Sequence, residues 1–300
     1  MENAAGNIPT VPAKTIVQRT KGGWFGADYN MNIYRGCSHG CIYCDSRSLC
    51  YRNVDFDIEK AKENALQIIR DELRRKVISG IITTGSMSDC YNRAERDLKL
   101  MRHTLELINA FGFGVAVLTK SDLVTRDIDV LQDIKTHSPI SVNITITTAS
   151  DEVCKKVEPN VSTTSERFDA MRKLAQSGIF CGTMLMPLLP FINDTEENII
   201  QIARRTKEAG GRFVYPDFGM TLRQGNREYY YDQLDKYFPG IKEKYIKQFG
   251  TRYHCPSPIS RKLAAVFRAE CERLGLLYDM KAITMHMKAG YENRQLMLDI

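Results

Sequence analysis

The chain has 300 residues, of which 43% are hydrophobic and 26% charged, and its formal net charge is +6. This length and apolar content suit one large α/β domain or two small ones with an ample core. No apolar run reaches the length of a membrane span and the N-terminus lacks a signal-peptide pattern, so we expect neither membrane insertion nor export. Nine cysteines in such a chain indicate a reducing, cytoplasmic environment rather than a disulfide framework.

Strands and helices are expected to alternate along the first two thirds of the chain. Strands are predicted at 28–35, 77–85, 113–119, 140–148, 179–186 and 212–218. Helices are predicted at 58–76, about 94–110, near 127–136, 164–177 and about 195–209. The clearest strand is 140–148, because β-branched residues dominate it. About six strand–helix units in this order predict an α/β fold with a parallel sheet.

The sequence changes character after residue 220, where it becomes rich in tyrosine, basic and mainly helical, with a last helix expected at about 260–274. We therefore predict three regions: an N-terminal extension of residues 1–27, a core of 28–220 and a helical extension of 221–300 packed on the core. After residue 200 there are 18 Lys and Arg against 11 Asp and Glu. This excess could attract nucleic acid, although solvated helices explain it more simply.

Cys37, Cys41 and Cys44 follow the spacing C-x3-C-x2-C. Three thiolates this close together can bind one face of a metal cluster, but they are one short of the four that a closed iron–sulfur cluster or a structural zinc site needs. The missing ligand leaves one iron open beside Tyr43, where it can bind a small molecule and pass it an electron. Reductive cleavage of S-adenosylmethionine is that chemistry.

Other interpretations of the cysteines stay open. A zinc site could use the same three thiolates and a remote ligand such as Cys50 or His39, and Cys50 could equally be a buried thiol. The remaining cysteines form no second C-x2-C group, so we predict no auxiliary iron–sulfur site; they are Cys90, Cys154, Cys181, Cys255 and Cys271.

The cysteine spacing, with an aromatic residue before the third cysteine, resembles the signature of the radical S-adenosylmethionine (radical SAM) superfamily. The resemblance implies a [4Fe–4S] cluster held by Cys37, Cys41 and Cys44, with S-adenosylmethionine bound at the open iron. It also implies an open, partial (β/α)6 barrel with a mainly helical C-terminal extension. An external electron donor, flavodoxin or ferredoxin, is the implied partner.

In such a barrel the ligand lies where the strands end. After the second strand, Ser86, Ser88 and Asp89 could accept the cofactor's ammonium group, although such a stretch is also typical of a turn or helix cap. After the third strand, Lys120 could reach a carboxylate or a ribose, or be an ordinary solvated charge.

Three further cofactor contacts are predicted, and Tyr43 beside the cluster is one of them. Thr145 in the fourth strand is a candidate ribose contact, with ordinary β-branched packing as the alternative. Arg167 could hold the methionyl carboxylate with a forked pair of hydrogen bonds, or form a surface ion pair with Glu166.

A longer series of motifs resembles the spore photoproduct lyase-like branch of this superfamily, from about residue 9 to 275. The matching positions are 32–47, 88–91 with Glu95, 119–121 with Arg126 and Asp127, 158–159 with Arg167, and 187–190 with 193–194. This resemblance implies cofactor contacts at Ser88, Lys120 and Thr145.

Two positions depart from the lyases, which repair a thymine dimer in spore DNA. Ser86 stands where the lyases need a hydrogen-donor cysteine, and Asp45 stands where they have a tyrosine after the third cluster cysteine. A hydroxyl is a poorer hydrogen-atom donor than a thiol, and aspartate cannot relay a radical. Cys90, four positions from Ser86, is the candidate substitute donor. We therefore predict the family's radical chemistry without photoproduct repair.

The predicted function is that of a radical SAM enzyme that cleaves S-adenosylmethionine to methionine and a 5′-deoxyadenosyl radical. The protein would orient the cofactor and exclude water, and the radical would abstract hydrogen from a substrate that the motifs do not specify. Two alternatives remain. One is a DNA or RNA repair or modification enzyme of the lyase type, which would hold nucleic acid with its basic last third. The other is a non-catalytic zinc or iron–sulfur module.

Overall fold

A seven-stranded sheet organises the computed structural model, which describes residues 8–53 and 55–291. The strand order is β10-β9-β8-β7-β6-β3-β2, in which β2 is antiparallel to β3 and the other six strands are parallel. The bounds are β2 Val17–Arg19, β3 Tyr29–Met31, β6 Ile81–Thr84, β7 Gly114–Thr119, β8 Ile140–Thr145, β9 Cys181–Leu185 and β10 Val214–Pro216. Six parallel strands in chain order confirm the predicted partial (β/α)6 barrel.

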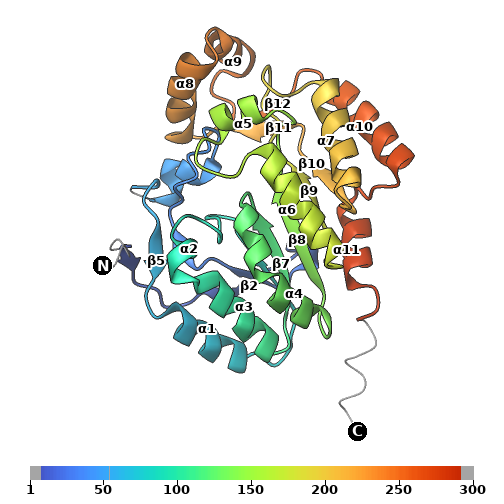
Figure 1. Ribbon diagram of the computed structural model, residues 1–300. Helices are drawn as coiled ribbons and strands as arrows, with labels where there is room; N and C mark the ends of the chain where they lie inside the picture. Colours follow the sequence, from blue (N-terminus) through green and yellow to red (C-terminus); the bar gives the residue numbers. More distant parts are fainter. Residues whose placement is uncertain (1–7, 54, 292–300) are drawn as a thin grey trace, which may run out of the picture.

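Helices between the parallel strands cover the outer face of the sheet (Figure 1). They are α1 Ala65–Arg74, α2 Glu95–Leu98, α3 Leu100–Ala110, α4 Ile128–Lys135, α5 Asp151–Val157, α6 Thr164–Gln176 and α7 Glu196–Glu208. Helix α3 buries Met101, Leu105 and Ile108, which lie on one face at helical spacing. All six residues of β8 are buried, as expected for a central parallel strand covered on both faces.

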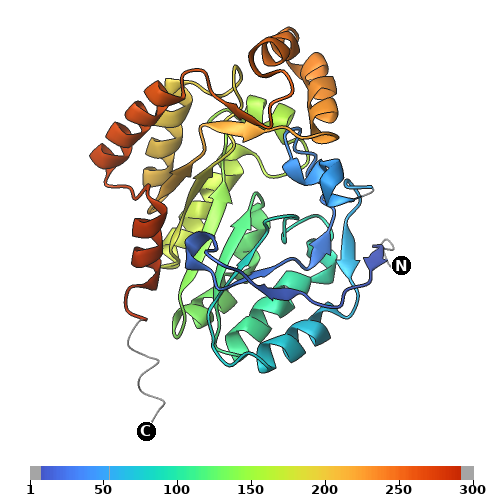
Figure 2. The ribbon, with the colours of Figure 1, turned by 180° about the vertical axis from the view of Figure 1, so that it is seen from behind.

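The C-terminal part of the chain is mainly helical, as predicted. It contains α8 Asn226–Tyr237, α9 Ile241–Phe249, α10 Ser260–Leu274 and α11 Met280–Lys288, with the antiparallel strands β11 Gly219–Thr221 and β12 His254–Pro256. Helix α10 packs on α7, and α11 contacts the short 3-10 helix η1, Trp24–Gly26. In Figure 2, which views the molecule from behind, η1 (dark blue) lies in front of the sheet and next to α11 (red). In the described part of the chain, no helix is both long enough and apolar enough to cross a membrane.

Two apolar clusters join the ends of the chain to the sheet and the cysteine loop. One packs Ile42 and Tyr43 of the cysteine loop with residues of α8 and α9, including Tyr230 and Tyr245. The other packs side chains of η1, the strands and α11, among them Phe25, Ala116, Met184, Phe213 and Ile283. Helices α8 and α9 therefore pack on the cysteine loop, whereas η1 and α11 pack together against the strands.

The first predicted strand and the first predicted helix differ from the structure. Residues 28–35 form two strands in separate sheets, β3 and β4 (Tyr34–Arg35). Strand β4 pairs with β5 (Lys60–Lys62), which also pairs with β1 (Thr10–Val11). Because β5 uses residues expected in the helix 58–76, α1 begins only at Ala65.

The second and the last predicted helices also differ. The helix expected at 94–110 is divided at Lys99, whose φ is +49°. The buried Glu95 carboxylate accepts a hydrogen bond from the Met101 backbone N–H at 2.8 Å, and so satisfies a donor at the start of α3. The helix 260–274 is not the last one, because α11 follows and buries Ile283 and Met287.

Several residues at positions that resemble lyase motifs form a buried ionic network. Arg126 donates to Glu95 at 2.7 Å and to Asp127 at 2.8 Å, and both carboxylates are fully buried. Tyr91 donates to Asp127 at 3.0 Å, and Tyr34 to Glu95 at 2.7 Å. We assign this network to stabilisation of the helices that cover the outer face of the sheet.

Candidate active site

The three cysteines lie on a loop that the rest of the fold holds in place. Gly36 precedes the loop with a φ of +79°, and a Cβ there would lie 2.2 Å from the Ile58 carbonyl oxygen, so only glycine fits. The Cys37 N–H donates to the carbonyl of Phe56 at 2.8 Å. The Ile42 N–H donates to the carbonyl of Val157 at 3.0 Å. The loop is therefore fixed at both ends.

The cysteine side chains are free thiols suited to a cluster. Cys37 and Cys41 are buried and Cys44 is half-buried. Burial, with a smaller contribution from Asp89, raises the pKa of Cys37 to about 12, and burial raises that of Cys41 as well. Thiols that resist ionisation in the metal-free protein become thiolates when a metal binds. Three free thiols on one loop are the kind of donor set that would hold an iron–sulfur cluster.

The proposed alternative zinc ligands lie in different surroundings. His39 is buried with its Nδ1 3.6 Å from Asp89 Oδ2. Cys50 is exposed, not buried, and its sulfur accepts a hydrogen bond from Arg223 at 3.4 Å. Within residues 8–53 and 55–291, no three or more His, Cys, Asp or Glu side chains are grouped for a single metal ion.

A pocket of about 580 Å³ opens beside Cys44 at the C-terminal edge of the parallel strands. The residues that line it come from the cysteine loop and the ends of β6, β7, β8, β9 and β10, and they include Tyr43, Cys44, Ser86, Leu118, Lys120, Thr145, Met186 and Asp217. At Gly85, where φ is +83°, a Cβ would lie 2.0 Å from the Leu118 carbonyl oxygen, so β6 and β7 meet closely at this edge. This is the edge at which barrel ligands bind.

Four of the seven predicted cofactor contacts line this pocket: Tyr43, Ser86, Lys120 and Thr145. Ser88 and Asp89 lie behind them. Ser88 donates to the carbonyl of Gly36. Asp89 accepts from the Thr119 hydroxyl at 2.7 Å and from the Lys120 N–H at 2.8 Å. These two side chains fix the cysteine loop and the end of β7 to each other.

Lys120 carries a positive charge toward the cysteine loop. Its Nζ lies 5.9 Å from the centre of the Tyr43 ring. Burial on its own would lower the pKa of Lys120, but the nearby Cys41 and Glu158 outweigh burial, so the pKa is raised. The ammonium therefore stays charged and forms no ion pair closer than 4 Å in the described part of the chain. It is available to a carboxylate in the pocket.

Lys120→Ala is expected to weaken binding of S-adenosylmethionine by roughly ten- to a hundred-fold, the usual effect of losing a charged contact. The cluster's visible absorption should not change, because Lys120 is not a cysteine ligand. Equilibrium binding to the anaerobically reconstituted protein measures the effect. Lys173→Ala, an exposed lysine on α6, is the matched control. Unchanged affinity in Lys120→Ala would assign the lysine to electrostatic support of the cysteine loop.

Arg167 is fully buried behind the pocket and does not line it. Its Nη1 lies 2.6 Å from Glu158 Oε2 and 2.9 Å from the Thr145 carbonyl oxygen, and its Nε donates to the Ser162 carbonyl at 2.8 Å. The alternative interpretation, a surface ion pair with Glu166, is wrong, because Arg167 is buried and Glu166 caps the start of α6. The guanidinium of Arg167 is engaged inside the protein and supports Glu158.

Glu158 connects Arg167 to the cysteine loop. The Tyr43 hydroxyl donates to Glu158 Oε1. Burial alone would raise the pKa of Glu158, but Arg167 and Lys120 outweigh it and lower the pKa, so the carboxylate stays charged. Burial, followed by the charge of Glu158, raises the pKa of Tyr43. Arg167, Glu158 and Tyr43 thus form a buried chain that orients the ring beside the cluster.

Arg167→Ala is expected to destabilise the protein by about 3–5 kcal/mol, because it leaves the buried Glu158 carboxylate without its counter-ion. Denaturant unfolding measures this loss. Adding Glu158→Gln to Arg167→Ala should recover part of it, since the uncompensated charge is removed. A residue that only contacts the cofactor would behave differently: Arg167→Ala would keep its stability and lose affinity for S-adenosylmethionine.

The structure separates Cys90 from the pocket. Cys90 is buried in the main apolar core, and its sulfur lies 3.3 Å from the Thr84 hydroxyl. Ser86 lines the pocket, and its hydroxyl donates to Asn30 at 3.2 Å. Asp45 also lines the pocket, where it accepts from the Tyr51 hydroxyl at 3.0 Å. The hydroxyl and the carboxylate that depart from the lyase pattern therefore both face the cavity.

Several other residues that line the pocket beside Cys44 were not predicted from the sequence. Thr20, Gly22, Gly23, Trp24 and Phe25 of the N-terminal segment line the pocket, as do Pro187, Asp217, Met220 and Thr221. Asp217 directly follows β10, the last of the parallel strands. It could therefore have been predicted as Lys120 was, from its place at the C-terminal end of a parallel strand. No signal in the sequence brings residues 20–25 to this edge, because their position depends on packing against α11.

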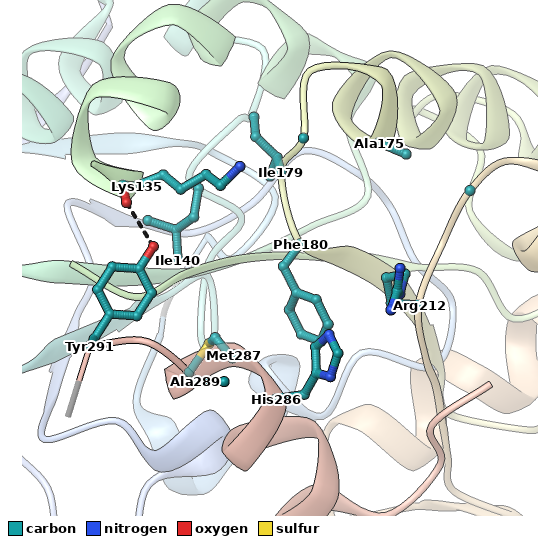
Figure 3. Close-up of a pocket in the computed structure, with 12 residues that line it drawn as sticks. Lys135, Ile140, Ala175, Ile179, Phe180, Arg212, His286, Met287, Ala289 and Tyr291 are labelled. Carbon is teal, nitrogen blue, oxygen red and sulfur yellow. Dashed lines mark hydrogen bonds between the residues drawn. The ribbon is translucent and has the colours of Figure 1, made fainter. Parts of the chain in front are cut away.

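A second pocket, of about 310 Å³, lies at the N-terminal edge of β8, β9 and β10, opposite the cysteine loop (Figure 3). It is lined by Lys135, Arg212, Phe180 and His286, among others, and the His286 ring stacks on Phe180 with centroids 5.2 Å apart. The Tyr291 hydroxyl donates to the Lys135 carbonyl at 2.7 Å. None of the predicted site residues lines this pocket.

The fold and the site define a class of protein: a partial barrel with a three-cysteine loop and a ligand pocket where its strands end. The sequence model of the Radical SAM superfamily matches residues 31–203. The chain therefore belongs to the radical SAM superfamily of enzymes, whose members use a [4Fe–4S] cluster and S-adenosylmethionine. The family's [4Fe–4S] cofactor takes the place of the zinc alternative.

Two relatives in sequence are themselves uncharacterized proteins. One from Mycobacterium tuberculosis is 30% identical over 224 residues, which cover 72% of this chain and 66% of that protein. One from Methanocaldococcus jannaschii is 34% identical over 197 residues, which cover 65% of this chain and 72% of that protein. The chain thus spans 66% of the length of its mycobacterial relative.

Solved structures share the fold. Spore photoproduct lyase complexed with dinucleoside spore photoproduct has a TM-score of 0.66 and 15% identity, over 87% of this chain and 77% of that chain. TsrM, a radical S-adenosylmethionine methyltransferase from Kitasatospora setae with tryptophan substrate bound, has a TM-score of 0.53 and 12% identity, over 80% and 51%. At these identities the likeness shows the fold alone, and it confirms the predicted lyase-like architecture.

Proposed function

We propose that this protein is an enzyme that reductively cleaves S-adenosylmethionine in the pocket beside Cys44. The 5′-deoxyadenosyl radical then abstracts a hydrogen atom from a substrate held in the same pocket. The observation that supports this most is the convergence of Cys44, Lys120 and Thr145 on one cavity of about 580 Å³. These residues are far apart in the sequence, and their chemistry matches the thiolate, carboxylate and ribose contacts that the cofactor needs.

Each residue's proposed role follows from its position. Cys37, Cys41 and Cys44 hold the cluster, which when bound supplies the electron that breaks the C5′–S bond. The Lys120 ammonium binds the methionyl carboxylate through a charged contact. The Thr145 hydroxyl, fixed on a fully buried strand, binds the ribose.

The rest of the pocket orients the ligands and limits access of water. The chain formed by Arg167, Glu158 and Tyr43 holds the aromatic ring beside the third cysteine. Met186 and Met220 add apolar surface that faces the cavity. Excluding water protects a reactive radical from side reactions.

The test is anaerobic incubation of the reconstituted protein with S-adenosylmethionine and dithionite, followed by detection of 5′-deoxyadenosine. Formation of 5′-deoxyadenosine that requires dithionite is the expected result. The control omits dithionite and should give none. Protein with its full iron content that forms no 5′-deoxyadenosine contradicts the proposal.

A flavodoxin or ferredoxin is the proposed electron donor in the cell, because the chain offers one three-cysteine loop and needs an external reductant. A cytoplasmic compartment is proposed on similar grounds. All nine cysteines are free thiols, and a reducing environment keeps them so.

Nucleic acid is the second candidate substrate, supported by a group of side chains near the pocket. Arg223 stacks between Tyr51 and Tyr253, with its guanidinium 5.6 Å and 4.4 Å from the two ring centres. It also lies 3.5 Å from Asp45, a pocket residue. Exposed rings beside an arginine are typical of single-strand binding. A salt-dependent affinity for oligonucleotides that is lost in Arg223→Ala would favour this candidate.

A further inference from the structure

Three charged side chains line the pocket beside Cys44: Lys120, Asp45 and Asp217. Lys120 faces the cysteine loop, as described above. Asp45 is compensated by Arg223 at 3.5 Å and by the Tyr51 hydroxyl. Among the described residues, no hydrogen bond or ion pair reaches the carboxylate of Asp217. Of the two acidic side chains that line this pocket, Asp217 is therefore the one without a direct partner among the described residues.

The position of Asp217 is fixed although its side chain is not engaged. It follows β10, and its N–H donates to the Leu185 carbonyl at 3.0 Å. Its own carbonyl accepts from the Leu188 N–H at 3.1 Å. Burial raises the pKa of Asp217, against a weaker opposing effect of His254. A half-buried carboxylate on a rigid backbone costs stability without a partner, and such groups are concentrated at functional sites.

An aromatic surface lines the same pocket as this carboxylate. Trp24 lines the pocket with 46% of its surface exposed, which is unusual for a large apolar side chain. Its ring packs edge-on against Tyr215, with centroids 6.1 Å apart, and Tyr215 lies two residues before Asp217. Phe25, next to Trp24, is anchored in the apolar cluster with α11. Trp24 is thus held at the pocket by a rigid support while much of its surface stays open.

We infer that Asp217 and Trp24 together bind a cationic group of the substrate, an ammonium or a guanidinium. A carboxylate and the face of an indole ring both attract such a group, and both act more strongly when partly shielded from water. Among the described residues, Lys120 is the only basic side chain that lines the pocket. Its proposed role assigns it to the cofactor carboxylate. A phosphate on the substrate therefore finds no counter-ion there. This inference rests on the proposed function and names the substrate class as amines or guanidines.

Trp24 is the only tryptophan of the chain, so its fluorescence reports directly on this part of the pocket. The probes are 2-phenylethylammonium and its neutral analogue 2-phenylethanol, which have nearly the same shape. Each is titrated into the holoprotein with saturating S-adenosylmethionine and no reductant, so that a probe cannot simply replace the cofactor. The ammonium is expected to bind at least about tenfold more tightly than the alcohol, in line with a charge-assisted contact.

Asp217→Asn is expected to reduce this preference to less than about twofold, because the amide keeps the shape but loses the charge. The matched control is Asp133→Asn, an exposed aspartate on α4 outside the pocket, which should keep the full preference. Equal affinities of the two probes for the unmodified protein would overturn the inference without any variant.

A second outcome would also overturn the inference: Asp217→Asn weakens S-adenosylmethionine binding tenfold but keeps the preference for the ammonium probe. Asp217 would then belong to the cofactor. The titration needs no cofactor cleavage, so it stays independent of the 5′-deoxyadenosine assay. A protein that makes no 5′-deoxyadenosine yet prefers the cation refutes the proposed reaction and leaves the binding site standing.

Discussion

Changing any one of Cys37, Cys41 or Cys44 to alanine is expected to abolish cluster assembly and cleavage of S-adenosylmethionine. Two thiolates cannot hold a cubane whose fourth iron is already open to the cofactor. The structure adds a reason why no other residue substitutes. The loop is fixed by Gly36 and by backbone hydrogen bonds to Phe56 and Val157, so a neighbouring side chain cannot move in to replace a lost thiolate.

Iron and sulfide content, visible absorption and 5′-deoxyadenosine formation measure the effect together. Cys50→Ala is the matched control, because Cys50 lies six residues after the loop's last cysteine but is exposed, and its sulfur accepts a hydrogen bond from Arg223. It should keep a full cluster and full cleavage. Full iron content and activity in any of the three loop variants would refute the ligand assignment.

The sequence was sufficient for the order of the barrel and for part of the pocket. The parallel strands could be predicted because they are short, rich in β-branched residues and separated by amphipathic helices. Lys120 and Thr145 could be predicted from their strands alone, since parallel strands bring their C-terminal ends to one edge. The cysteine loop could be predicted from its spacing, which the chemistry of the cluster requires.

Other parts of the fold and of the pocket depend on contacts between distant segments, and no local sequence pattern predicts them. Strand β5 replaces the first turns of a predicted helix because its backbone pairs with β1 and β4. Arg167 is on a helix that looks amphipathic, and only the fold shows that its guanidinium meets Glu158 in the interior. Trp24 reaches the pocket because the N-terminal segment packs on α11, more than 250 residues later.

The two departures from the lyase pattern are more significant because of the positions of the side chains in the structure. Ser86 and Asp45 both line the pocket, so neither position can be discounted as peripheral. Asp45 is held by Arg223 and Tyr51, which makes it a fixed polar part of the wall. Cys90, the candidate substitute thiol, is turned into the apolar core beside Thr84.

This protein is accordingly expected not to repair the spore photoproduct efficiently. A product-centred radical formed in this pocket would meet the Ser86 hydroxyl, whose O–H bond gives up hydrogen far less readily than a thiol. Cys90 is buried in the main apolar core and does not line the pocket, so its thiol lies out of reach of that radical. Anaerobic turnover of a dinucleotide photoproduct measures the effect, with substrate-free cleavage of S-adenosylmethionine as the baseline.

Multiple turnovers to intact thymines, at a rate comparable to that of a lyase, would contradict the prediction. If that turnover vanished in Cys90→Ala but survived in Cys50→Ala, the buried thiol would be the donor, and the core around Thr84 would have to open during catalysis.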